Sequence, residues 1–208
     1  MKISEILTLE DEKKSHNNAY DSEENLYWYD ELSDEENEDW DNKTKELVVD
    51  AHVAIQDYTE SGGNYDLDQA YHTIMKYQPR YAYSGEMYRS IILKPEDMLV
   101  PDLRTMTAKL HRWAMQHSRE IVSWSVDLDF VIEHGGDWKA GLVLYQESKG
   151  LDIISMDGTS FEDEQEVLSP YSNNLSIYGF ISEEEFFPVN EFNRFLKHLK
   201  SLDNIENS

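Results

Sequence analysis

The feature that most limits the possible folds of this chain is a change in the spacing of its apolar residues near residue 80. Between residues 42 and 77 they recur at the three- and four-residue spacing of amphipathic helices. Most later apolar runs are short, rich in β-branched and aromatic residues, and bounded by turn residues, as strands are. Helices followed mainly by strands predict an α+β domain with a mixed or antiparallel sheet, because a parallel sheet would need alternating βαβ units.

The pattern predicts four main helices and six strands. The first helix begins at Asn42 and ends where paired glycines follow Ser61, and Asp66 is a possible N-cap for the second. The other helices are expected at 67–77, 103–117 and 190–202, with a short helical turn at 126–133. Strands are expected at 87–93, 121–125, 141–145, 151–154, 166–168 and 175–181. A turn is expected at Tyr83-Ser84-Gly85.

Composition excludes several classes of protein. The chain has 208 residues, of which 39% are hydrophobic, enough for one domain with a core. It has no cysteine, which excludes disulfides, thiol nucleophiles and Cys-ligated zinc. No stretch is long and apolar enough to cross a bilayer, and residues 1–14 lack the apolar core of a signal peptide. We expect a cytoplasmic protein that makes no membrane contact.

The negative charge is large and uneven. With 43 Asp+Glu and 18 Lys+Arg, the net charge is −25. Such a surface repels phosphate backbones, which argues against direct nucleic-acid binding and favours basic partners or mimicry of nucleic acid. Residues 1–41 are interpreted as an acidic N-terminal arm and residues 42–208 as the main domain. The arm either docks on the domain through its aromatic rings or is disordered, and the sequence leaves both possibilities open.

No metal site is expected. Asp157 and Glu164 have the spacing of part of a calcium loop, but Ile153 occupies the first ligand position. Asp127 and Asp129 are interpreted as a solvated acidic pair, and none of the seven histidines pairs with another histidine or a carboxylate in a way that recruits a third ligand. The chain also lacks the glycine-rich fingerprints of nucleotide-binding loops and the Gly-x-Ser-x-Gly nucleophile motif.

Three groups of polar residues occur in an order that suggests chemistry. Arg89 lies on the first expected strand, Ser123 and Ser125 on the second, and Glu164 and Glu166 at the start of a later one. Arginine supplies fixed donors for a pyrophosphate, and serine can position a ribose hydroxyl or another side chain. A carboxylate can stabilise an oxocarbenium-like transition state. Such a set could hold a dinucleotide and break a glycosidic bond.

This order resembles that of the arginine–serine–glutamate class of mono-ADP-ribosyltransferases, which includes bacterial toxins and tailed-phage enzymes. The resemblance covers about residues 42–181 and includes three further patterns: Ile55-Gln56-Asp57-Tyr58-Thr59 before Asp66-Leu67, the pair Tyr88-Arg89, and Phe161 before Glu164-x-Glu166-Val167-Leu168. Ser90 replaces the glycine that often follows the arginine, and Trp124 replaces the usual threonine between the serines. The resemblance implies an ADP-ribosyltransferase-like fold with a sheet around an NAD cleft.

The resemblance also implies the roles of individual residues. NAD would be the substrate, with Arg89 holding its phosphates or nicotinamide ribose and Ser123 orienting the catalytic glutamate. Ser125 would contribute to NAD binding. Glu166 would bind the ribose 2′-hydroxyl and stabilise the cation as nicotinamide leaves.

The other implied roles concern the acceptor. Glu164 would orient or deprotonate an acceptor arginine, and Phe161 would help to recognise the protein that carries it. The implied acceptors are host transcription or translation proteins, by analogy with the phage enzymes. Some phage relatives also transfer NAD-linked RNA, but this sequence shows no basic groove for RNA. The alternative is a non-catalytic acidic interaction protein or DNA mimic, which would explain the charge but not the order of the polar motifs.

Overall fold

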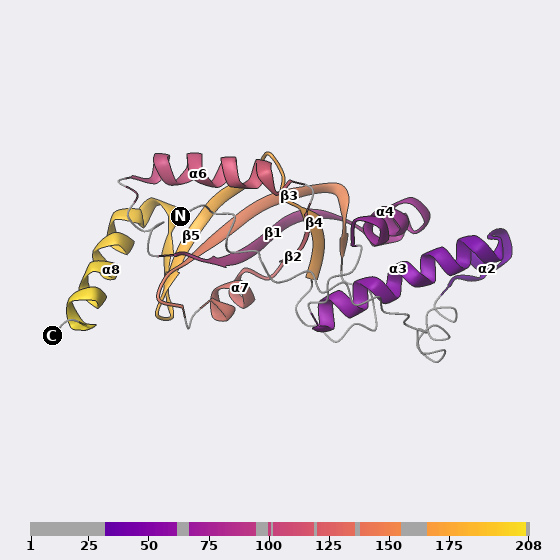
Figure 1. Cartoon of the computed structure of the whole chain (residues 1–208), viewed down its shortest axis with the longest axis horizontal. Coiled ribbons are helices and arrows are strands. Elements are labelled where there is room, and N and C mark those ends of the chain that lie inside the picture. The colour runs from indigo at the N-terminus through magenta and orange to yellow at the C-terminus, as the bar shows by residue number, and fades with distance from the viewer. Residues whose placement is uncertain are drawn as a thin grey trace, which may run out of the picture.

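Antiparallel strands form the centre of the structure (Figure 1). The computed structural model describes residues 32–61, 67–94, 100, 102–118, 120–135, 138–154 and 166–206. Within these residues the sheet has six strands in the order β1-β2-β4-β3-β5-β6, with a further pairing of β1 and β3. The strands are β1 (Ala82–Ile92), β2 (Ile121–Ser125), β3 (Gly141–Ile154), β4 (Glu166–Pro170), β5 (Ser176–Ser182) and β6 (Glu185–Pro188). The chain is therefore an α+β protein, as the sequence predicts, and every described pairing is antiparallel.

Four of these strands close into a ring. Strand β1 pairs with β3 along its whole length, and β3 pairs near its end with β4. Strand β4 pairs with β2, and β2 returns to β1 through one residue pair, Tyr88 with Ser125. Strands β1 and β2 therefore meet at a single point. Strands β5 and β6 extend the sheet from the other edge of β3.

Helices cover both sides and both ends of the sheet (Figure 1). Helix α6 (Leu103–Gln116) lies on one side, and α7 (Leu128–His134) lies on the other. Apolar residues of α6 and of α8 (Phe192–Glu206) pack in the largest core cluster with Trp124, Leu144 and Phe180. On the opposite side, Val131 of α7 packs with apolar residues of β1, β3 and β5. The sheet thus has a buried layer on each side.

A second core lies where the N-terminal helices meet the ring. Helix α3 (Asn42–Ser61) and helix α4 (Leu67–Tyr77) bury apolar faces against each other and against Leu168 of β4. The short helix α2 (Asp34–Asp39) precedes them, and the 3-10 helix η2 (Pro79–Tyr81) leads from α4 into β1. Four helices that the sequence predicts are confirmed, with α4 matching its predicted bounds, whereas Asp66 lies outside the described residues.

The structure corrects the sequence prediction in three places. The turn predicted at Tyr83-Ser84-Gly85 is wrong, because these residues belong to β1. The pairing register shifts between Tyr83 and Ser84. Gly85 has a φ of 154°, and a Cβ on it would collide with the Tyr83 side chain. A glycine is therefore needed at this irregular point of the strand. The strands predicted at 141–145 and 151–154 are one strand, β3. The sequence prediction also omitted α2 and β6.

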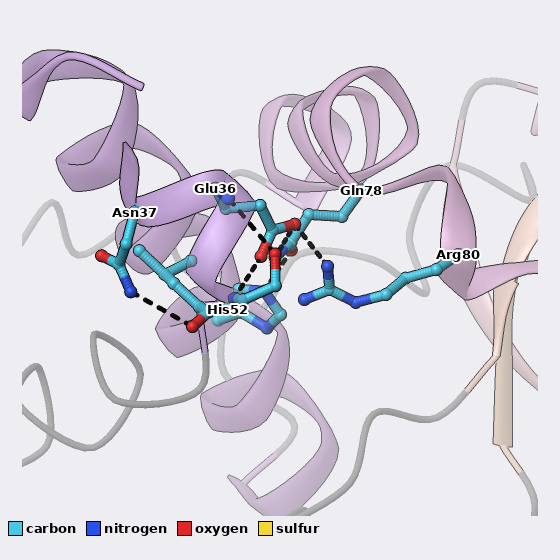
Figure 2. Close-up of polar contacts among 7 residues, drawn as sticks. Glu36, Asn37, His52, Gln78 and Arg80 are labelled. Atoms are coloured by element: carbon cyan, nitrogen blue, oxygen red, sulfur yellow. Dashed lines mark hydrogen bonds and ion pairs between the residues drawn. The ribbon is translucent and has the colours of Figure 1, made fainter. Parts of the chain in front are cut away.

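A buried polar network holds α2 to the rest of the protein (Figure 2). The Glu36 carboxylate accepts hydrogen bonds from the backbone amide of Ser33 at 2.8 Å and from Nε2 of Gln78 at 3.2 Å, and it pairs with Arg80. Gln78 Oε1 in turn lies 2.5 Å from Nε2 of His52 on α3. Although burial raises the Glu36 pKa, these hydrogen bonds and the charge of Arg80 outweigh it and lower that pKa overall. The carboxylate is therefore held ionised.

The described part of the predicted acidic arm contacts the domain. Leu32 is buried in the core of α3 and α4, and the Trp40 ring meets the edge of Tyr77 at 5.8 Å. Residues 32–41 thus pack against helices that the sequence analysis assigned to the domain of residues 42–208. A membrane-spanning segment is not found among the helices of the described residues.

Candidate functional site

A pocket lies beside the point where β1 and β2 meet. Its volume is about 330 Å³. It is lined by residues of β1, β2, α7, the segment after α7, and the start of β4, namely Tyr88, Arg89, Ser90, Ser123, Trp124, Ser125, Phe130, Val131, His134, Trp138 and Glu166. The candidate residues Arg89, Ser123, Ser125 and Glu166 therefore share one pocket.

The pairing of β2 with β4 explains how serine and glutamate come together. Ser125 is directly opposite Glu166, and Ser123 is opposite Leu168. Residues directly opposite in an antiparallel pair point to the same face, and residues two apart on one strand do so too. Ser123, Ser125 and Glu166 thus share one face of the β2–β4 pair. Glu166 is only 8% exposed, so its carboxylate lies in a largely dehydrated part of the pocket.

Arg89 connects the two strands that border the pocket. It lies one residue beyond the Tyr88–Ser125 pair, and its Nη1 donates a hydrogen bond to the carbonyl oxygen of Ser123. Its guanidinium also interacts with the Tyr171 hydroxyl. Burial raises the pKa of that hydroxyl, and the charge and hydrogen bond of Arg89 only partly offset the increase. Buried Nε of Arg89 has no hydrogen-bond partner among the described residues. Since a guanidinium has five N–H donors, Arg89 is the strongest anion-binding group of the pocket.

Ser125 also shapes the turn from β2 into α7. Its Oγ accepts a hydrogen bond from the backbone amide of Asp127 at 3.0 Å. Asp127 caps α7, because its carboxylate accepts hydrogen bonds from the amides of Asp129 and Phe130 at 2.9 and 3.2 Å. The pair Asp127 and Asp129 thus has a structural explanation at the start of a helix. Ser125 positions α7 against the pocket.

Aromatic side chains also line the pocket and form its aromatic wall, and the sequence analysis did not identify them. Phe130 and His134 of α7 are stacked with ring centroids 5.9 Å apart, and the His134 ring meets the edge of Trp138 at 6.3 Å. Tyr88 contributes from β1. Flat aromatic faces beside an arginine suit a ligand that carries both a planar ring and an anionic group. The four-residue spacing of Phe130 and His134 is a signal that could have placed them on one helix face.

Two predicted site residues lie outside the described residues. Glu164 and Phe161 fall in segment 155–165, so the predicted acceptor-recognition residues have no structural description. Within the described residues, no group of three or more His, Cys, Asp or Glu side chains could hold a metal ion. The described site therefore consists of a guanidinium, two serines, a buried carboxylate and an aromatic wall.

Comparison with known proteins adds no relative to these observations. The sequence matches no protein-family model, and no curated protein matches it significantly.

Proposed function

We propose that this protein is an NAD-dependent mono-ADP-ribosyltransferase of the arginine–serine–glutamate class that modifies arginine side chains of other proteins. The observation that carries the proposal is the shared pocket of Arg89, Ser123 and Glu166, which come from three different strands. Their order in the chain resembles that of the family, and their meeting at one pocket is what a common reaction would require. The finer fold assignment, an ADP-ribosyltransferase-like fold, belongs to the same proposal.

The pocket offers a complementary group for each part of NAD. The Arg89 guanidinium is suited to the pyrophosphate, because its fork of donors matches two phosphate oxygens. The aromatic wall of Phe130, His134 and Trp138 is suited to a planar nicotinamide or adenine ring. The buried carboxylate of Glu166 is suited to a ribose hydroxyl and to the positive charge that develops on the ribose.

The proposed reaction breaks the bond between C1′ of the ribose and the nicotinamide nitrogen. The electron pair of that bond leaves with nicotinamide, which becomes neutral, and the ribose becomes an oxocarbenium-like cation. A guanidinium nitrogen of the acceptor arginine then forms a bond to C1′ and loses a proton. Glu166 stabilises the cation electrostatically, and Glu164 accepts the proton in this scheme.

Glu166→Gln tests the proposal. This substitution keeps the shape of the side chain and removes its charge, so transfer should fall by about 10²–10³-fold, as expected for loss of a major transition-state stabiliser. The assay is incubation of the purified chain with labelled NAD and a cell lysate, followed by detection of labelled protein. NAD binding should persist and can be followed by tryptophan fluorescence, because Trp124 and Trp138 line the pocket.

The matched control is Glu133→Gln. Glu133 is an exposed glutamate of α7 that does not line the pocket, so its loss should leave transfer unchanged. Full transferase activity in Glu166→Gln would disprove the assigned role. Absence of any labelling or NAD binding by the wild-type protein, combined with tight binding to a basic DNA-binding protein, would instead support the acidic interaction protein.

Glu164→Gln separates the acceptor step from the NAD step. The variant should lose transfer to arginine to a greater extent than it loses hydrolysis of NAD, because water needs less help in orientation than a guanidinium does. Equal losses of both activities would remove the acceptor role of Glu164.

A further inference from the structure

Two exposed glutamates lie beside three tyrosines on the side of the sheet that carries α7, and of these tyrosines Tyr88 is buried whereas Tyr145 is partly exposed and Tyr178 is exposed. Opposite residues of β1 and β3 share a face, and these pairs are Glu86 with Glu147 and Tyr88 with Tyr145. The Tyr178 ring on β5 meets the edge of Tyr88 at 5.2 Å and lies 6.3 Å from Tyr145. We call these five residues the acid–tyrosine face.

The carboxylates of this face carry a local excess of negative charge. Glu86 accepts hydrogen bonds from the hydroxyls of Tyr88 at 2.9 Å and Tyr145 at 3.4 Å. Glu147 stands directly opposite Glu86, and like charges in that arrangement destabilise a sheet. The ion pairs found among the described side chains involve neither glutamate. An external cation would relieve this repulsion.

The tyrosines keep the face chemically suited to a cation. Burial raises the pKa of the Tyr145 hydroxyl, and the charges of Glu86 and Glu147 raise it further, so the hydroxyl stays neutral and donates. Tyr178 is 37% exposed and is one of three large apolar side chains that are exposed in the described residues. Its ring also stacks at 6.1 Å on Phe186, which holds it in place.

The face adjoins the candidate site. Tyr88 belongs to both, because it lines the pocket and contacts Tyr145 and Tyr178. Helix α7 packs on the same side of the sheet, where Val131 contacts Tyr88 in the core, and it contributes Phe130 to the pocket. A partner bound at the acid–tyrosine face would therefore lie next to the pocket.

We propose that the acid–tyrosine face is a docking surface for an arginine-bearing, basic segment of a partner protein. A guanidinium can pair with two carboxylates through its fork of donors and can stack on tyrosine rings, whereas an ammonium ion matches only the charge. The inference that the bound segment belongs to the acceptor protein rests on the proposed transferase function. As an arginine-binding surface, the face does not depend on catalysis.

The test is direct binding of a short peptide in the absence of NAD. Fluorescently labelled tetra-arginine and tetra-lysine peptides are titrated with the full-length protein, and anisotropy is measured at physiological ionic strength. There the Debye length is about 8 Å, so distant charges contribute little. The wild-type protein should bind the arginine peptide several-fold more tightly, about threefold or more, because only arginine gains the bidentate and stacking contacts.

The decisive variant is Glu86→Gln with Glu147→Gln, and the matched control is Glu35→Gln with Glu38→Gln. Both pairs remove two charges, but the control residues are exposed on α2 and lie outside the face. The face variant should weaken arginine-peptide binding by about tenfold, and the control should change it by less than about twofold. The side-chain amides of the face variant can still accept the tyrosine hydrogen bonds, so this variant should fold, and circular dichroism checks it.

Tyr178→Ala provides an independent test of stacking. It should weaken binding of the arginine peptide more than that of the lysine peptide, and the preference for arginine should shrink. Equal affinity of the wild-type protein for both peptides would overturn the proposal, as would equal weakening by the face variant and the α2 control. The measurement needs no catalysis, so an inactive protein that still prefers arginine would refute the transferase and leave the docking surface standing.

Discussion

His52 should make the stability of this protein depend on pH between neutral and mildly acidic conditions. It is a histidine of α3 with 2% of its surface exposed, and its Nε2 lies 2.5 Å from Gln78 Oε1 (Figure 2). Because that oxygen can only accept, Nε2 is the donor of this hydrogen bond. Burial lowers the pKa of His52 from 6.5 to about 4, with Gln78 and Glu36 opposing the shift and Arg80 adding to it.

The size of the effect follows from the difference between folded and unfolded chains. The folded pKa lies below the unfolded value, so the unfolded chain takes up the proton first as the pH falls. The stabilisation by neutral His52 is therefore present above pH 6.5 and is lost as the pH falls toward 4. Linkage gives a loss of about 2 kcal/mol between about pH 7.5 and 5, approaching about 3 kcal/mol at lower pH. Glu36, whose pKa is lowered from 4.5, adds its own loss only below that value.

The assay is urea unfolding followed by tryptophan fluorescence at several pH values, for the wild type and for His52→Gln. The glutamine can still donate its amide hydrogen to Gln78, but it does not titrate. The variant should be less stable at neutral pH, and its stability should fall with acid by about 2 kcal/mol less than that of the wild type. If the difference between the two proteins stays constant across this range, His52 does not titrate as the structure implies.

Three further predictions concern stability and are measured by the same unfolding assay or by thermal melting. A double-mutant cycle of Glu36→Gln and Arg80→Met should give a coupling of about 1–2 kcal/mol, reduced from the value for a buried pair because the Arg80 side chain is 41% exposed. A coupling below about 0.5 kcal/mol would show that the Glu36–Arg80 ion pair does not help to hold α2 in place. Changing Glu183→Asn with Glu184→Gly should stabilise the protein by about 1–2 kcal/mol, because both glutamates, between β5 and β6, have positive φ, 45° and 67°. A loss of stability would contradict the positive φ angles at these two positions. Gly179→Ala should cost about 1–3 kcal/mol, because its Cβ would lie 2.7 Å from the Phe187 carbonyl oxygen. An unchanged melting temperature would count against that packing.

The fold was predictable where the apolar spacing was regular. Helix α4 and strand β2 occupy the predicted bounds because their patterns end at clear turn residues. Gly85 misled the prediction, since a glycine within an irregular strand resembles a turn in the sequence. Helix α2 was missed although Ser33 and Glu36 form a capping box, because the acidic composition of the segment hid that signal.

The candidate site was predictable only in part, because some of its residues are marked by the sequence and others are placed by tertiary packing. Arg89, Ser123 and Glu166 were found through the order of residue types along the chain, and strand pairing brings them to one pocket. Trp138 and His134 were not found, because their place in the pocket depends on how α7 packs against β1. Such packing is set by tertiary contacts of residues distant in sequence, which no local pattern encodes.

The single contact between β1 and β2 has a consequence for folding order. Strands β1, β2 and β4 all contribute residues to the pocket, and Tyr88 with Ser125 is the one described backbone pairing between β1 and β2. Closing the ring there joins segments that are separated by more than 30 residues, at an entropic cost that is repaid by little local pairing. We therefore expect the pocket to form after the β1–β3 pairing and to be lost before it, so ligand binding should report on the last step of assembly.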